Sequence, residues 1–182
     1  MIKKHVFLIL ALVFLTSCAT YNEVNTPIAE INSYGVYKIS SDTVSYIAEN
    51  AATGYASLSE YETLLKETTE IPALKCISFG YKYEIRDFPE SLDDKITMVV
   101  KHPLMKNYLG MKSNITRGDL PLELENGVYK DSIIYMMRHD YEVLQGEWEL
   151  QILYRENILL TKTFNVYEAK QNERPNKAIN CD

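Results

Sequence analysis

The sequence has few of the residue patterns that mark common enzyme classes. Only three cysteines and three histidines occur among its 182 residues, and none of them shows the CxxC or Cys/His spacing typical of zinc sites. The glycine patterns of Rossmann and P-loop sites are missing, and so is the GxSxG turn of many hydrolases. The sequence therefore predicts no metal and no cofactor.

Clusters of positive charge are also missing. The chain contains 19 Lys and Arg residues against 25 Asp and Glu residues, which gives a formal net charge of −6. Nucleic-acid binding depends on clustered Lys and Arg side chains that neutralise phosphates. The acidic balance therefore argues against a nucleic-acid partner.

The first residues have the pattern of a secretory signal. Met1–His5 contains two lysines, and Val6–Leu15 is almost wholly apolar. This apolar run is too short for a stable membrane span, and its flanks are those of a signal peptide. Removal of residues 1–17 would leave 165 residues with 17 basic and 25 acidic side chains, a net charge of −8. That length suits one domain with short tails.

The signal ends in Leu15-Thr16-Ser17-Cys18, which resembles the lipobox of bacterial lipoproteins. The resemblance implies cleavage before Cys18 and lipidation of Cys18, so that a membrane is one partner. Several acyl chains on one residue give durable anchoring, whereas a single chain holds only marginally. Ala19 follows the cysteine, and by resemblance to Gram-negative sorting rules this favours the outer membrane, with the domain facing the periplasm. The alternative is an ordinary signal peptide with a chance cysteine.

Polar segments flank the predicted domain. Residues 18–32 are interpreted as the lipidated cysteine and a flexible tether, and residues 169–182 as a polar tail, because both contain proline and show little periodicity. The domain itself is predicted over residues 33–168.

The clearest β-pattern lies in Gly146–Val166, which predicts a long hairpin. Apolar and polar residues alternate from Trp148 to Tyr154, so one strand face should enter a core while the other meets water. Arg155-Glu156-Asn157 form a polar break before the return strand. Lys162 interrupts the return strand, which predicts either a bulge within residues 159–162 or a lysine that leans inward with its stem packed.

Other alternating runs predict further strands, and the 14 tyrosines favour β-structure as well. These strands are expected at residues 34–39, 60–68, 77–85, 95–101, 129–138 and 141–144. Gly35 is expected to allow a close backbone approach or a bulge. Residues 40–54 are compatible with a short helix capped by Asp42 or with a strand. Ile71-Pro72 is expected to end a strand, because proline cannot donate to the ladder.

These elements predict an all-β fold. About seven or eight strands, separated by turn signals, are the pattern of an immunoglobulin-like antiparallel β-sandwich. His102–Leu124 contains two prolines and two glycines, so it is predicted to be a long connection. Long connections are often functional, which makes this segment the first candidate for a binding surface.

Three stretches resemble one family. They are Ile71-Pro72 followed by Phe79-Gly80-Tyr81-Lys82-Tyr83, the His102-Pro103 step, and Gly146-Glu147-Trp148-Glu149-Leu150-Gln151-Ile152 leading to Thr163-Phe164-Asn165-Val166. Over Tyr34–Val166 the chain is similar to the bacterial DUF3859 family, a group of small exported domains of uncharacterised function. Gln145 stands where the family usually has proline, and Arg155-Glu156-Asn157 stands where it usually has a glycine turn. The resemblance implies a β-sandwich and supplies no catalytic residues.

Two cysteines remain once Cys18 is lipidated. An exported compartment allows a disulfide between Cys76 and Cys181, which would tie the tail to the strands. The competing interpretation is a buried free thiol at Cys76 and an exposed one at Cys181, because sequence alone cannot place their Cα atoms within bonding range.

Few residues suggest catalysis. His102 and His139 are the only histidines of the mature chain. His139 and Asp140 are adjacent and would point in opposite directions on a strand. A triad would need a nearby hydroxyl such as Ser132 in a strained turn. Surface or rim positions are the simpler interpretation of both histidines.

Other candidates have simpler structural interpretations. Trp148 could stack on a ligand but is expected in the core. Tyr81 and Tyr83 are expected in the core with their hydroxyls at its rim. Glu147 and Glu149 share one strand face, where paired carboxylates can do acid–base chemistry or bind calcium. A solvated acidic face is the expected outcome.

These features favour a lipid-anchored, non-catalytic binding or structural module that holds an envelope protein or glycan. One alternative is an envelope hydrolase or metal-dependent enzyme that uses His102, His139 and Asp140. Another is a carrier of a small apolar ligand, which would need an open apolar cavity between the sheets.

Overall fold

In the part of the chain that it describes, the computed structural model has eleven strands and one short 3₁₀ helix. The structure describes residues 26–39, 43–47, 55–59, 62–89 and 95–173. The strands are β1 (Ile28–Ile39), β2 (Thr43–Ile47), β3 (Tyr55–Ser59), β4 (Glu62–Lys66), β5 (Glu70–Pro72), β6 (Ser78–Arg86), β7 (Lys95–Lys106), β8 (Lys112–Pro121), β9 (Tyr129–Met136), β10 (Gly146–Tyr154) and β11 (Asn157–Tyr167), and the 3₁₀ helix η1 is Asp140–Glu142.

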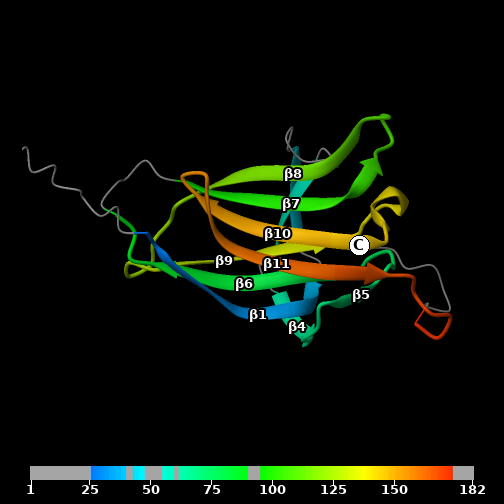
Figure 1. The fold of residues 1–182 in the computed structure, drawn as a ribbon, viewed down its shortest axis with the longest axis horizontal. Helices are drawn as coiled ribbons and strands as arrows, with labels where there is room; N and C mark the ends of the chain where they lie inside the picture. Colours follow the sequence, from blue (N-terminus) through cyan, green and yellow to red (C-terminus); the bar gives the residue numbers. More distant parts are fainter. Residues whose placement is uncertain (1–25, 40–42, 48–54, 60–61, 90–94, 174–182) are drawn as a thin grey trace, which may run out of the picture.

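Nine strands form the two sheets of a sandwich (Figure 1). One sheet has four strands in the order β4-β1-β6-β9, and the other has five in the order β5-β11-β10-β7-β8. Strands β2 and β3 form a separate two-stranded sheet. The pairs are antiparallel except for β5 with β11. The described residues contain no apolar helix of the length needed for a membrane span.

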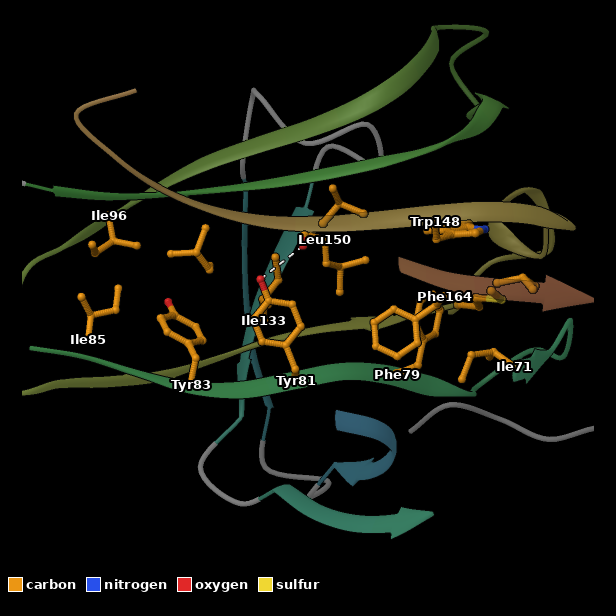
Figure 2. Packing of buried hydrophobic residues seen from close by; sticks show 14 of the residues in the cluster. Ile71, Phe79, Tyr81, Tyr83, Ile85, Ile96, Ile133, Trp148, Leu150 and Phe164 are labelled. Atoms are coloured by element: carbon orange, nitrogen blue, oxygen red, sulfur yellow. Dashed lines mark hydrogen bonds between the residues drawn. The ribbon is translucent and has the colours of Figure 1, made fainter. Parts of the chain in front are cut away.

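The core is built on β6, the strand with the cleanest alternation (Figure 2). Phe79 packs edge-on against Trp148 and Phe164 of the opposite sheet, with ring centroids 5.6 and 5.3 Å away. Trp148 is fully buried, which confirms its core position. Tyr81 is fully buried too, and its hydroxyl donates a hydrogen bond of 3.2 Å to the Leu150 carbonyl. The prediction that this hydroxyl lies at the rim was wrong.

The predicted hairpin is β10–β11. Its loop is Arg155-Glu156, since Tyr154 pairs with Asn157, and both loop residues have positive φ, 48° and 63°. Two positive φ values in a two-residue loop are those of a type I′ turn. The register shifts so that Leu159 is left over, which confirms the predicted bulge. Lys162 also leans inward, with its ammonium 3.3 Å from the Tyr34 ring centroid.

Two glycines allow neighbouring backbones to approach. Gly35 and Gly80 pair between β1 and β6. A Cβ on Gly35 would lie 2.0 Å from the Lys66 carbonyl oxygen, and one on Gly80 would lie 1.9 Å from the Ile133 carbonyl oxygen. The expected close approach at Gly35 is therefore confirmed, and the register shifts just beyond it, between Val36 and Tyr37.

The largest error concerns the segment 102–124. Instead of a long connection, β7 continues through Pro103 to Lys106 and β8 returns over Lys112–Pro121. Pro121 ends β8, and Gly118 lies within this edge strand. Proline and glycine are tolerated at edges and bulges, so they do not exclude a strand there.

Several smaller predictions also change. Ile71-Pro72 belongs to the short parallel edge strand β5, where a missing N–H costs little. Residues 43–47 form a strand, so the helical alternative is wrong for them. Residues 140–142 form a 3₁₀ helix rather than part of an extended segment.

The domain is also longer than residues 33–168. Strand β1 begins at Ile28, inside the predicted tether, and Ala169 is buried. The signal, Cys18 and Cys181 lie outside the described residues. Cys76 is disulfide-bonded, and the pairing with Cys181 stays a prediction.

The β10–β11 turn generates a stability prediction. Positive φ is costly for residues with a Cβ, and Asn-Gly is the preferred type I′ pair. Replacing Arg155-Glu156 by Asn-Gly should raise the free energy of unfolding by about 1 kcal/mol. Urea denaturation monitored by fluorescence would measure the change.

The control for this change is Arg117→Ala, which removes the ion pair between Arg117 and Glu156 and keeps the turn sequence. An exposed ion pair contributes little, so this variant should lose less than about 1 kcal/mol. A less stable Asn-Gly variant would contradict the assigned turn conformation.

Candidate binding surface

The β7–β8 hairpin carries the main exposed apolar surface in the described structure. Strand β8 lies at the edge of the five-stranded sheet, and the hairpin tip extends from one end of the sandwich (Figure 1). Leu104, Tyr108, Leu109 and Met111 are 63%, 63%, 65% and 53% exposed. Several large apolar side chains exposed on one hairpin indicate an interaction site.

A buried asparagine holds the tip in one conformation. Asn107 is only 4% exposed. Its side-chain oxygen accepts hydrogen bonds from the N–H groups of Leu109 and Met111, each 3.0 Å long. Its backbone N–H donates to the Met111 carbonyl, and its carbonyl accepts from the Gly110 N–H at 2.9 Å. Gly110 has a φ of 82°, a region that glycine enters without strain.

A kink at the base of the hairpin turns the tip away from the ladder. Lys101 pairs with Ile115 and Met105 with Ser113, so three residues of β7 stand opposite one of β8. Pro103 lies in this kink and has no N–H to give to the ladder. A Cβ on Gly146 would lie 3.0 Å from the Pro103 ring. The glycine that begins β10 therefore makes room for the proline.

His102 is buried at this kink, 5% exposed, and its ring packs on Trp148 with centroids 5.1 Å apart. Its Nδ1 lies 2.9 Å from the Pro103 carbonyl oxygen. A carbonyl only accepts, so Nδ1 carries the hydrogen and Nε2 is left as an acceptor. Burial lowers the pKa of His102, which keeps the ring neutral.

A cleft of about 260 Å³ lies beside the kink. It is lined by Lys101, His102, Asn114, Ile115, Glu147 and Glu149. Glu149 is engaged there, because it accepts hydrogen bonds from Lys101 at 2.7 Å and from Gln151 at 2.9 Å. The structure thus brings together His102 and the two glutamates, which lie far apart in the sequence.

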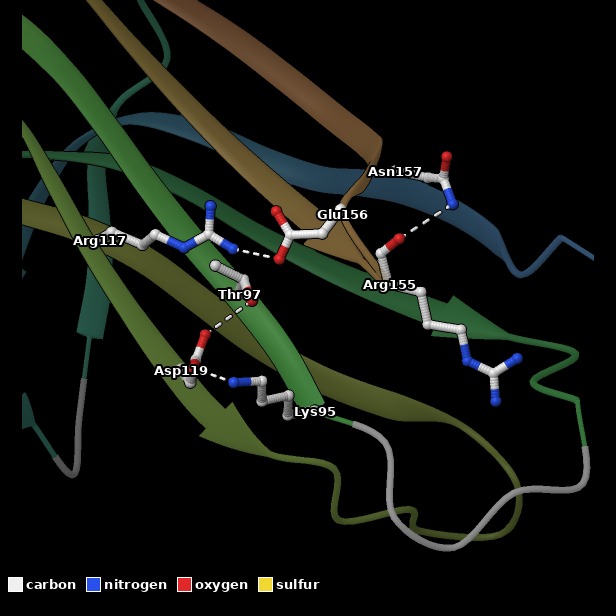
Figure 3. A network of polar contacts seen from close by, with 7 residues as sticks. All are labelled: Lys95, Thr97, Arg117, Asp119, Arg155, Glu156 and Asn157. Atoms are coloured by element: carbon white, nitrogen blue, oxygen red, sulfur yellow. Dashed lines mark hydrogen bonds and ion pairs between the residues drawn. The ribbon is translucent and has the colours of Figure 1, made fainter.

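Polar contacts secure the other end of the same strands (Figure 3). Asp119 of β8 bonds to Lys95 and, at 2.7 Å, to Thr97 of β7. The Lys95 hydrogen bond, with that of Thr97, lowers the pKa of Asp119. Arg117 reaches Glu156 in the β10–β11 turn. These contacts therefore fix β7 and β8 at the end opposite the hairpin tip.

The remaining catalytic candidates lie elsewhere. His139 precedes η1 and stacks on Tyr141 with centroids 5.2 Å apart. Asp140 is exposed and pairs with Lys75 at 3.5 Å. Ser132 donates a hydrogen bond of 2.8 Å to Glu62. None of these residues lines the cleft beside His102.

The described residues contain no group of three or more His, Cys, Asp and Glu side chains arranged to hold a metal ion.

Glu142 is a buried carboxyl that the sequence patterns did not identify. It accepts hydrogen bonds from the Tyr135 hydroxyl and the His139 N–H. Burial raises the pKa of Glu142. A glutamate three residues after His139 is the spacing of a capping box, which was the available signal.

Comparison with known proteins agrees with the architecture. The family model described as "Domain of unknown function (DUF3859)" matches residues 25–166. The crystal structure of an immunoglobulin-like protein from Pseudomonas aeruginosa is similar to this chain, with a TM-score of 0.58 and 22% identity over 80% of this chain and 99% of that chain. That likeness confirms the predicted immunoglobulin-like sandwich. No curated protein matches the chain.

The buried His102 predicts a pH dependence of stability. Its folded pKa is lowered, so the unfolded chain binds a proton first as the pH falls below about 6.5. The free energy of unfolding should therefore decrease between about pH 7 and pH 5. His102→Phe should remove this part of the decrease, as measured by urea denaturation at several pH values.

His139→Gln is the matched control, because His139 is exposed. This variant should still lose stability between about pH 7 and pH 5, because His102 is unchanged in it. The raised pKa of Glu142 gives the opposite slope, a loss of stability as the pH rises through that pKa. His102→Phe leaves this contribution unchanged, because His102 is not among the groups that shift the pKa of Glu142. Equal slopes in the two histidine variants would contradict the assignment.

Proposed function

The chain belongs to the DUF3859 family, and within that family we propose that it is a lipid-anchored cell-envelope protein whose β-sandwich is a non-catalytic binding module. Its proposed anchor is the lipid on Cys18 in the bacterial outer membrane, with the domain facing the periplasm. The proposed binding surface is the β7–β8 hairpin.

The anchor is supported by the sequence before the domain. A basic start, an apolar run of ten residues and Leu15-Thr16-Ser17-Cys18 stand in the order that lipoproteins use. Ala19 after the cysteine supports outer-membrane sorting. Strand β1 begins at Ile28, so about ten residues separate the anchor from the sandwich.

The observation that carries the binding role is the exposed apolar tip of the hairpin. Leaving large apolar side chains in water forgoes about 1.5–3 kcal/mol for each one that could be buried. Here the N–H groups of Leu109 and Met111 donate hydrogen bonds to the Asn107 side chain and so fix the turn in which Tyr108 and Leu109 are exposed. A rigid turn that exposes such side chains favours contact with another envelope component.

The enzyme alternative, an envelope hydrolase or metal-dependent enzyme, has weaker support. It needs His102, His139 and Asp140 to act together. His102 is buried against Trp148, whereas His139 stacks on Tyr141 and Asp140 pairs with Lys75. Because each of the three side chains has its own separate contact, these contacts do not support a shared catalytic site.

The carrier alternative needs an open apolar cavity between the sheets. That space instead holds the packed cluster of Phe79, Tyr81, Trp148, Leu150 and Phe164 with its buried neighbours (Figure 2). A core filled in this way argues against a bound apolar ligand.

Lipidation is directly testable. Metabolic labelling with radioactive palmitate in a bacterial host should label the full-length chain, and Cys18→Ala should remove the label. Ser17→Ala, which keeps a small residue before the cysteine, should retain it. A labelled Cys18→Ala variant, or an unlabelled parent chain, would contradict the proposed anchor.

The binding surface can be tested by photocrosslinking in the native envelope. A photoreactive amino acid at Leu109 should form discrete adducts with an envelope component, identified by mass spectrometry. The same group at Ile158, which is 55% exposed near the other end of the sheet, is the control and should form few. Equal adduct patterns at both positions would exclude the hairpin as the binding surface.

A further inference from the structure

The hairpin tip combines its apolar side chains with a local excess of positive charge. From Lys101 to Gly118 the sequence contains four Lys and Arg residues and no Asp or Glu, although the whole chain has a net charge of −6. Lys101 pairs with Glu149, and Arg117 pairs with Glu156. The other two, Lys106 and Lys112, lie at the tip.

The positions of these two lysines cause electrostatic repulsion within the isolated protein. Lys106 and Lys112 are both exposed and stand directly opposite each other in the β7–β8 ladder. Like charges in that position destabilise a strand pair. Among the described residues, no ion pair includes either lysine. An anion placed between them would relieve the repulsion.

The apolar side chains restrict the kind of anion. Four apolar residues next to or between the two lysines in the sequence are more than half exposed: Leu104, Tyr108, Leu109 and Met111. Apolar and aromatic residues next to lysines are the pattern of segments that lie in a membrane interface, with lysine at the headgroups and the apolar groups among the upper acyl chains.

The shape of the tip favours a bilayer over a protein. The tip is a single protruding turn (Figure 1), whereas a stable protein interface takes about 800 Å² from each partner. A lipid surface has no fixed shape to match, so a convex turn can insert between headgroups.

We propose that the tip of the β7–β8 hairpin inserts into an anionic lipid surface. Tyr108, Leu109 and Met111 enter the headgroup and upper acyl region, while Lys106 and Lys112 bind lipid phosphates. This assignment rests on the proposed function, because it names the envelope component that the hairpin binds. Asn107 contributes by holding the turn in the inserted conformation before binding.

The test reads membrane contact at the tip itself, so it does not depend on how the rest of the chain is attached. Full-length protein carrying Tyr108→Trp is bound to vesicles that contain brominated phosphatidylcholine, with or without phosphatidylglycerol. Brominated chains quench tryptophan on contact. The natural Trp148 is fully buried and supplies a constant background.

Quenching should be several-fold stronger in the phosphatidylglycerol vesicles. Adding Lys106→Glu and Lys112→Glu should lower the ratio of inserted to free tip by more than about tenfold, since each lysine near an anionic surface contributes about a factor of five. Ile158→Trp is the matched control, an exposed apolar position near the other end of the sheet, and should stay unquenched.

Three results would overturn the lipid assignment: no quenching at residue 108, equal quenching at residues 108 and 158, or quenching that neither phosphatidylglycerol nor the lysines alter. If Leu109 then crosslinks to an envelope protein or glycan, the binding module stands and only its lipid partner is wrong. If Leu109 also gives no specific adduct, the hairpin is not the binding surface and the proposed function fails as well.

Discussion

The structure depends on the contact between the aromatic face of β6 and the inner face of the β10–β11 hairpin. Phe79 lies against both Trp148 and Phe164, and Tyr81 donates its hydroxyl to the Leu150 carbonyl. Burying rings of this size supplies much of the apolar area that holds two sheets together. The hydrogen bond of the Tyr81 hydroxyl also fixes the position of one sheet relative to the other. A shift of either sheet would leave a buried polar group unpaired, at a cost of about 1–3 kcal/mol.

That contact also places the hairpin that carries the candidate surface. Strand β7 pairs with β10 along Ile96–Lys101, so its position follows from that of the core strand. Beyond this ladder, His102 rests on Trp148 and Pro103 fits over Gly146. The tip then projects past the core while its base stays tied to it. Gly146 and Trp148 therefore contribute both to the core and to the position of the candidate surface.

The sequence predicted the elements whose side chains alternate without interruption. β6 and the β10–β11 hairpin follow from period-two patterns, and so does the burial of Trp148. β7 and β8 were missed beyond Lys101 because Pro103, Gly110 and Gly118 look like loop signals, whereas the kink and the edge position make them compatible with strands. β5 is only three residues long, too short to show an alternation of apolar and polar residues. Its parallel pairing with β11 therefore could not be predicted from the sequence.

The candidate surface was predictable in part. The length of the segment 102–124 makes it a candidate surface in the sequence, and in the structure this segment carries exposed apolar side chains as part of a hairpin. His102, Glu147 and Glu149 could be named from the sequence, but their meeting in one cleft depends on the β7–β10 register, a long-range pairing that local patterns do not contain. The role of Asn107 depends on hydrogen bonds within a turn whose shape was unknown.

Trp148 is the only tryptophan of the chain, and its position gives the molecule an internal optical reporter. Its indole is fully buried, donates to the Leu144 carbonyl at 3.1 Å and touches Phe79, Tyr135 and His102. Global unfolding would expose the ring to water and shift its emission to the red. A displacement confined to the base of the hairpin would change only its contact with the histidine, altering intensity with little shift in wavelength. The two kinds of motion can therefore be distinguished in the unmodified protein by its own fluorescence.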